Sequence, residues 1–232
     1  MTDHLSNAPS TTVSEAISSR RSLRAFLPAE VPRADIDSLL ERAARAPSGT
    51  NMQPWHTYVL TGATRQRLCD ETCAAFDEQS VEHTSETRYY PTTWFEPYLS
   101  RRRQVGWGLY NLLGIERGER ERIRGQHRRN FRFFDAPVGL LFTIHRDLAP
   151  GSLLDYGMFL QNIMLLAREC GLHTCPQAAW ADYHQVARLI LPISPEEVLL
   201  CGMALGQADP DAVENSLVTE RAPIDEWTSF FD

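Results

Sequence analysis

Three arginines and a serine lie within five residues near the amino terminus, in the stretch SRRSLRAF at positions 19–26. Arg20, Arg21 and Arg24 supply guanidinium groups, and Ser22 supplies a hydroxyl. A guanidinium can donate to two phosphate oxygens at once, and each charge-assisted hydrogen bond contributes about 1.5 to 3 kcal/mol. The cluster therefore suits a phosphate group, although a solvated surface patch would have the same composition.

A second group of small and polar residues follows the helix-forming run ERAARA, in APSGTN at positions 46–51. Pro47 disfavours helix at the preceding residue, so the helix should end there. Gly49 permits close approach of the backbone, and Asn51 carries both a donor and an acceptor. This corner can be a simple turn, or it can be the place where a flat, polar-edged ring lies against the backbone.

Taken together, these motifs resemble the FMN-dependent nitroreductase family. RRSLRAF is followed some 20 residues later by APSGTNMQPWHTYVL, and both resemble the amino-terminal half of that family. The later stretches GLHTCPQAAW and NSLVTERAPIDEW are similar to further family motifs in the same order, so the resemblance covers residues 12–230. It implies an α+β, nitroreductase-like fold in which helices flank a mixed central sheet. It also implies an intertwined homodimer with one FMN at each subunit interface.

The resemblance further implies which residues contact FMN. The arginines of the first motif and Arg221 would hold the phosphate, and Arg24 would face the pyrimidine side of the ring. The corner would line the ring and its ribityl chain, and a later loop would present a backbone amide to flavin N5. The implied cofactor-binding residues are Arg20, Arg21, Ser22, Arg24, Pro47, Ser48, Gly49, Asn51, Pro176, Gln177, Ala178, Ala179 and Arg221. No catalytic side chain and no metal is implied, because the flavin carries the electrons.

Two departures from the family pattern concern the positive charges. Some members have a second basic residue where this chain has Thr219, and others use a lysine near the pyrimidine edge of the flavin. This chain contains no lysine, so any positive charge in its site must come from arginine or histidine.

Alternating and apolar patterns predict the elements that position these motifs. Thr12 and Glu15 form a capping-box signature for a helix that runs to about Ser19, and Pro32 suits the first turn of a second helix. The nearly all-apolar stretch 153–170 predicts a helix buried on several sides. Short runs rich in branched and aromatic residues predict strands at 56–60, 138–144 and 198–206.

The division of the chain follows from these patterns. Residues 1–11 are small and polar and predict a flexible amino-terminal arm. Residues 12–232 predict a single FMN-binding, nitroreductase-like domain. Within it, residues 80–132 interleave aromatic residues with arginines, which is typical of a helical lid or dimer segment over a pocket. Aromatics beside arginines can also bind single-stranded nucleic acid, but the net charge of −7 favours the lid.

Composition indicates the cellular compartment of the protein and the partners it can have. No run approaches the length of a membrane span, and the first residues lack the basic start and apolar core of an export signal. The five cysteines cannot all pair within one chain and match no strong zinc pattern. We therefore expect a cytoplasmic protein with reduced thiols, and neither nucleic acid nor a membrane as its partner.

The expected activity is the reduction of nitroaromatic compounds by NADH or NADPH, in a ping-pong cycle of hydride transfer through FMN. A lid arginine can pair with an acidic substituent, so carboxylated compounds such as nitrobenzoate are favoured acceptors. The candidates are Arg88, Arg101, Arg102, Arg103, Arg128, Arg129 and Arg132. Quinones, activated alkenes and halogenated aromatics remain alternative acceptors, and a flavin carrier or redox sensor without turnover remains an alternative function.

Overall fold

A four-stranded antiparallel sheet forms the centre of the computed structural model, which describes residues 5–78, 80 and 82–232. The strands follow the order β1-β2-β4-β3. Their bounds are β1 (His56–Leu60), β2 (Val138–His145), β3 (His173–Gln177) and β4 (Glu197–Gly206). The three predicted strands are confirmed, and β3 is an additional edge strand. The ladders are antiparallel, so the parallel part of the expected mixed sheet is limited to a bridge between Ser22 and Thr174.

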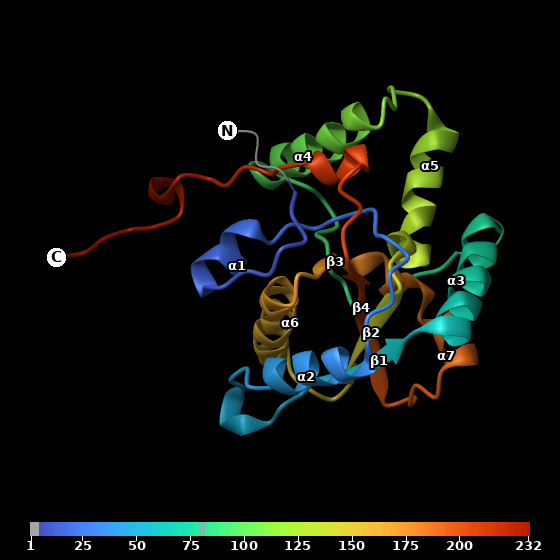
Figure 1. Ribbon diagram of the computed structural model, residues 1–232, viewed down its shortest axis with the longest axis horizontal. Coiled ribbons are helices and arrows are strands. Elements are labelled where there is room, and N and C mark those ends of the chain that lie inside the picture. Colours follow the sequence, from blue (N-terminus) through green and yellow to red (C-terminus); the bar gives the residue numbers. More distant parts are fainter. Residues whose placement is uncertain (1–4, 79, 81) are drawn as a thin grey trace.

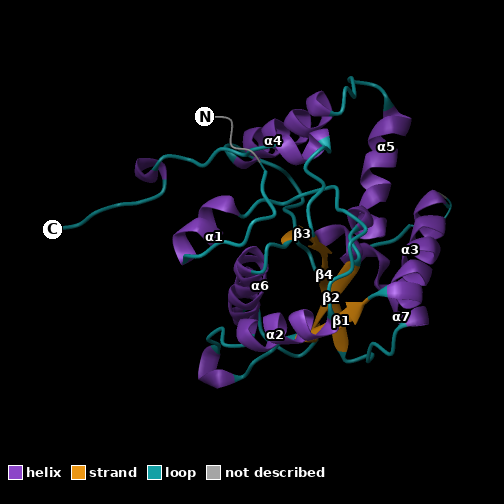
Figure 2. Ribbon diagram, viewed as in Figure 1, coloured by secondary structure: helices purple, strands orange, loops and turns teal. Residues whose placement is uncertain are grey.

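Helices surround this sheet (Figures 1 and 2). They are α1 (Val13–Ser19), α2 (Arg33–Ala43), α3 (Gly62–Asp77), α4 (Tyr98–Leu112), α5 (Arg120–Arg128), α6 (Gly151–Glu169) and α7 (His184–Ile190). The predicted capping box starts α1, because the Thr12 hydroxyl accepts from the Glu15 N–H at 3.1 Å while the Glu15 carboxylate accepts from the Thr12 N–H at 3.1 Å. Pro32, which was expected in the first turn of the second helix, lies at the N-cap position, one residue before α2 begins. In the described residues, no helix is long and apolar enough to cross a membrane.

Two hydrophobic cores lie on the two faces of the sheet. Strand β2 is buried on both, and its successive residues Leu140 and Leu141 belong to different cores because side chains alternate along a strand. Helices α2 and α6 cover the face of Leu140, and α3 and α7 cover the face of Leu141 (Figure 1). The sheet is therefore the middle layer of an α/β/α sandwich.

The α3 side of the sheet is packed without spare volume around Trp180. This residue begins the buried part of the 3-10 segment η3 (Ala178–Tyr183), and its ring stacks on Phe133 with centroids 4.4 Å apart. A Cβ atom at Gly202 of β4 would overlap the Trp180 ring, and one at Gly139 of β2 would overlap Phe133. Side chains packed this closely leave no space into which the Trp180 ring could shift. The sheet thus fixes η3, which directly continues strand β3.

The two ends of the chain differ in how they are held. Ser10 donates its N–H to the Arg168 carbonyl at 2.9 Å, and Asn7 exchanges hydrogen bonds of 3.0 Å with Ala208. The described part of the expected flexible arm is therefore anchored to the body, and residues 1–4 lie outside the described residues. The carboxyl-terminal segment instead extends away from the body (Figure 1), and Phe230 and Phe231 are 81% and 92% exposed.

Candidate active site

A cavity of about 980 Å³ lies between the end of β3 and the segment that carries α4 and α5. This volume is typical of a pocket for a cofactor with a substrate. One wall is formed by Arg24, Cys175, Pro176, Gln177, Ala178 and Ala179. The opposite wall includes Tyr89, Tyr90, Arg102, Trp107, Tyr110, His127 and Asn130. The cavity therefore unites two groups of predicted cofactor residues with the predicted lid.

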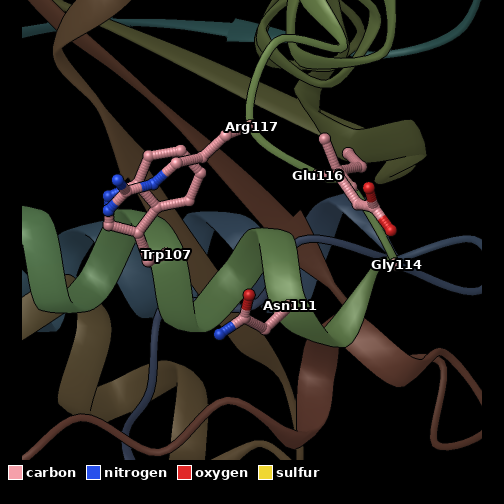
Figure 3. Close-up of a pocket in the computed structure, with 6 residues that line it drawn as sticks. Trp107, Asn111, Gly114, Glu116 and Arg117 are labelled. Atoms are coloured by element: carbon pink, nitrogen blue, oxygen red, sulfur yellow. The ribbon is translucent and has the colours of Figure 1, made fainter.

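A second, shallower hollow lies at the turn between α4 and α5 (Figure 3). There the guanidinium of Arg117 lies 4.8 Å from the centroid of the Trp107 ring. Trp107 also lines the main cavity, so the two hollows meet at its ring. No predicted cofactor residue lines the second hollow, and the main cavity is the candidate active site.

Arg24 is held in the cavity wall by Asn215, a residue that the sequence analysis did not single out. The Arg24 N–H donates to Asn215 Oδ1 at 2.8 Å, and Asn215 Nδ2 donates to the carbonyls of Ala25 and Asp209 at 2.8 and 2.9 Å. Asn215 is only 1% exposed, so these bonds are shielded from water. Next to it, Ser22 forms its parallel bridge to Thr174. The arginine motif is thus fixed between β3 and the start of the carboxyl-terminal segment.

Arg20 and Arg221 approach each other without a carboxylate between them. Burial lowers the pKa of Arg20, and the nearby charge of Arg221 lowers it further. Arg221 donates only to Thr219 and to the Glu220 carbonyl. Within the part of the chain that the structure describes, neither arginine forms a salt bridge. Two adjacent cations that lack a counter-ion fit a doubly charged phosphate.

Arg20 and Arg24 both lie close enough to the cavity wall for their charges to act on Cys175, which lines it. Burial raises the pKa of the Cys175 thiol to about 11, although the two positive charges oppose the shift. Arg21 lies elsewhere: burial lowers the pKa of Arg168, and Arg21 contributes to that shift. Successive side chains of an extended segment point to opposite sides, and Arg20 and Arg21 therefore lie in different surroundings.

The segment predicted as a loop near flavin N5 has regular structure. Pro176 and Gln177 end strand β3, and Ala178 and Ala179 begin η3, so the expectation of a loop is corrected. Gln177 Nε2 donates to the Asn130 carbonyl at 2.7 Å, whereas its buried Oε1 has no partner among the described residues. An unsatisfied buried acceptor on a residue that lines the cavity fits a ligand with a hydrogen-bond donor, such as a flavin ring.

The corner formed by Pro47, Ser48, Gly49 and Asn51 is not part of this cavity. It forms a single 3-10 turn after α2, at the bottom of the view in Figure 1, whereas α4 lies at the top. Pro47, Gly49 and Asn51 are exposed. The Gly49 N–H donates to Asp155 Oδ2 at 3.1 Å, so Asp155 of α6 caps this turn and not its own helix. Within one chain, the corner therefore lies apart from the other predicted cofactor residues.

Ion pairs divide the arginines of the lid into two groups. Arg101 pairs with Glu226 at 3.0 Å, Arg128 with Asp77 at 2.9 Å and Arg132 with Asp135 at 2.9 Å. Arg129 pairs with the buried Glu214. In contrast, Arg88, Arg102 and Arg103 line the cavity and have no carboxylate partner in the described chain. Only these last three remain candidates for pairing with an acidic substrate.

The carboxylate of Glu86 anchors the segment that leads into the lid. Glu86 accepts from Arg146 Nη2 and Arg188 Nη2, each at 3.0 Å, and lies 3.3 Å from His184 Nδ1. Burial opposes ionisation of Glu86, but the hydrogen bonds from Arg146 and Arg188 lower its pKa overall. These contacts join residues far apart in the sequence and were not predicted. They hold the start of the segment that brings Tyr89 and Tyr90 to the cavity.

Comparison with known proteins places this geometry in a family. The Nitroreductase family model matches residues 17–207. The 4-nitrobenzoate reductase of Nocardioides sp. (strain LMS-CY) is 40% identical over 215 residues, which cover 91% of this chain and 86% of that relative. The nitrobenzene nitroreductase of Ectopseudomonas oleovorans is 38% identical over 218 residues, which cover 94% and 96%.

Solved structures give the same result. The FMN and NADPH-dependent nitroreductase NfnB from Sphigopyxis sp. strain HMH is similar with a TM-score of 0.91 and 38% identity, covering 95% of this chain and 99% of its own. The FMN-dependent nitroreductase NfnB from Mycobacterium smegmatis, solved in complex with NADPH, is similar with a TM-score of 0.90 and 32% identity, covering 94% and 97%. This chain belongs to the Nitroreductase family.

Proposed function

We propose that the protein is an FMN-dependent enzyme that uses NADH or NADPH to reduce nitroaromatic compounds. The carrying observation is the cavity in which Arg24 meets the β3–η3 wall, with Arg20 close enough to act on Cys175 in that wall and Arg221 close enough to act on Arg20. Similarity to nitroaromatic reductases along most of the chain supports the same reaction. Bound FMN would supply the two-electron chemistry that links oxidation of the nicotinamide to reduction of the nitro group.

The residues of the chain bind and polarise the cofactor. Arg20 and Arg221 hold the phosphate, since their mutual repulsion is relieved by an anion between them. Arg24 keeps a permanent positive charge at the pyrimidine edge, which favours the reduced ring, and Asn215 fixes its backbone. Arg21 lies on the other side of the segment, where its charge acts on Arg168. The walls formed by η3 and the lid exclude water from the reacting atoms.

The functional unit that we propose is a homodimer in which the corner of one protomer completes the cavity of its partner. The corner is exposed and distant from the cavity of its own chain, so a second copy can supply it. On α6, beside the corner, Leu153 and Leu154 are 47% and 74% exposed, and these apolar side chains suit burial against a second copy. Residues 12–232 then act as one FMN-binding domain with residues 80–132 as its lid.

Carboxylated nitroaromatics, such as nitrobenzoate, are the preferred acceptors in this proposal. The three lid arginines without carboxylate partners face the cavity and favour an anionic substrate. Quinones, activated alkenes and halogenated aromatics are competing acceptors. The cytoplasm is the proposed compartment, because it supplies the nicotinamide donor and keeps the five free thiols reduced.

Cofactor release and a kinetic screen test the activity. Purified protein should be yellow, release FMN on denaturation and reduce nitrobenzene, with parallel lines in double-reciprocal plots. Release of FAD, or no flavin, would remove the cofactor assignment, and intersecting lines would exclude the shared pocket. Bound FMN without turnover of any nitroaromatic, quinone or halophenol would favour a flavin carrier.

A charge on α6 tests the dimer separately. Leu154→Glu should give a monomer in sedimentation analysis, with weakened FMN binding because each cavity loses its partner's corner. Leu189→Glu is the matched control, since Leu189 is 82% exposed but lies on α7, across the sheet from α6. If the two variants had the same oligomeric state and the same FMN affinity, this result would argue against an interface at α6.

A further inference from the structure

Arg102 differs from its neighbours on α4 in how its guanidinium is held. It lies over the ring of Trp94, 4.8 Å from the ring centroid, and it lines the cavity. A guanidinium that stacks on an aromatic face keeps its N–H edge available for hydrogen bonds while losing much of its freedom to rotate. Stacking therefore preorganises this arginine for a planar, two-point acceptor such as a carboxylate.

The groups around Arg102 do not satisfy its charge. Its guanidinium is close enough to influence the ionisation of Tyr90, Tyr110 and His127. Tyr110 and His127 bind each other, with 2.9 Å between the Tyr110 hydroxyl and His127 Nε2. Burial lowers the pKa of His127, and the charge of Arg102 lowers it further. These groups are polar but not acidic, so among the described residues the site around Arg102 has hydrogen-bonding capacity and no carboxylate that pairs with Arg102.

The acidic residue that does line the cavity, Asp182, interacts with groups other than Arg102. Burial raises the pKa of Asp182, and the groups that act on it are Ser85, His184 and His83. Of the other two unpaired arginines in the described cavity wall, Arg88 and Arg103, neither is stacked on an aromatic ring. Arg102 is thus the cation of this wall that is both uncompensated and fixed in direction.

We propose that Arg102 is the specificity residue of the lid and that it binds the carboxylate of an aromatic substrate. The inference rests on the proposed function for the reaction, but it concerns recognition of the ring substituent. Because Arg102 is exposed, solvent weakens the pairing, and we expect a preference of about tenfold for an acidic ring over its neutral analogue. The hydrogen-bonded pair of Tyr110 and His127 retains one further donor beside Arg102.

The test compares three variants of the FMN-loaded protein. Arg102→Gln should lower the ratio of kcat/KM for 4-nitrobenzoate to that for nitrobenzene by about tenfold. Arg102→Lys keeps the charge without the two-point geometry and should recover part of the ratio. Arg101→Gln removes the same charge from the adjacent position, where Arg101 pairs with Glu226, and should leave the ratio within about twofold of the wild type.

Equilibrium binding gives a readout that does not depend on turnover. Calorimetry should show that the wild type binds benzoate about tenfold more tightly than benzamide, and that Arg102→Gln abolishes this difference. That result supports the inference even if nitrobenzene is not reduced, which would count against the proposed function alone. The inference is overturned if the wild type shows no preference for benzoate, if Arg102→Gln retains the preference, or if Arg101→Gln loses it equally.

Discussion

Replacing Arg20 with alanine should separate cofactor binding from folding. Without a cofactor, Arg20 and Arg221 repel each other with no carboxylate partner in the described chain, so the loss of one charge should not destabilise the apoprotein. With FMN bound, the substitution removes a charge-assisted contact worth about 1.5 to 3 kcal/mol. The dissociation constant for FMN should therefore rise about 10- to 150-fold.

The same substitution has a calculable effect on stability in the presence of FMN. A ligand that binds only the folded state stabilises it by RT ln(1 + [L]/Kd). At an FMN concentration of 100 times the wild-type Kd, this is about 2.7 kcal/mol for the wild type. With a Kd about 100-fold higher, it falls to about 0.4 kcal/mol. Arg21→Ala should retain most of the wild-type gain, because Arg21 lies beside Arg168 and not beside Arg221.

Urea unfolding with and without FMN measures these quantities directly. The expected order of FMN-dependent stabilisation is wild type, then Arg21→Ala, with Arg20→Ala and Arg221→Ala well below both. If FMN stabilised Arg20→Ala more than Arg21→Ala, the assignment of the phosphate site would be refuted. A strongly destabilised Arg20→Ala apoprotein would refute the argument from uncompensated repulsion.

Two further predictions concern groups that support the site. Burial and the charge of Arg168 lower the pKa of His173 to about 4. Between about pH 6.5 and 4, the unfolded chain therefore binds a proton that the folded chain does not. The free energy of unfolding should fall by roughly 3 kcal/mol as the pH drops through this window. His173→Gln should flatten that dependence in urea titrations at pH 7 and pH 4.5, and an unchanged slope would exclude His173 as its source. Asn215→Ala leaves three backbone groups without their buried partner and should cost about 2 to 4 kcal/mol of stability, whereas Asn215→Asp keeps the acceptor for the Arg24 N–H and should retain more FMN affinity than the alanine variant. Equal FMN affinity of the two Asn215 variants would argue that Asn215 does not position Arg24.

The sequence indicated the central elements because their patterns are strong. The run HTYVL at 56–60 is strand β1 at the same bounds, and the apolar stretch 153–170 corresponds closely to α6. Strand β3 was missed because HTCPQ is short, has little apolar alternation and contains Pro176. Proline is tolerated there because β3 lies at the edge of the sheet, where one side needs no ladder partner.

The arrangement of the site depended on contacts that no local pattern encodes. Arg101 is neutralised by Glu226, and Arg128 by Asp77, residues that are distant in the chain. The seven candidate arginines of the lid therefore looked equivalent in the sequence, whereas the folded chain leaves three without a carboxylate partner in its described part. Motif order likewise contained no information on whether the corner at Gly49 reaches the cavity of its own chain.

The packing of Trp180 against Gly202 bears on how this protein can evolve. The wall that includes η3 is constrained by glycines that admit no side chain, so substitutions there would disrupt the sheet before they altered the choice of substrate. The opposite wall carries Tyr89 and Tyr90, which are 72% and 55% exposed and can change at little cost in folding. Activity toward new electron acceptors should thus arise through substitutions in the lid, while the residues of the wall that includes η3 stay constant. A mutant library aimed at altered substrates should be confined to positions 88–110, where diversity and a folded, flavin-loaded protein are compatible.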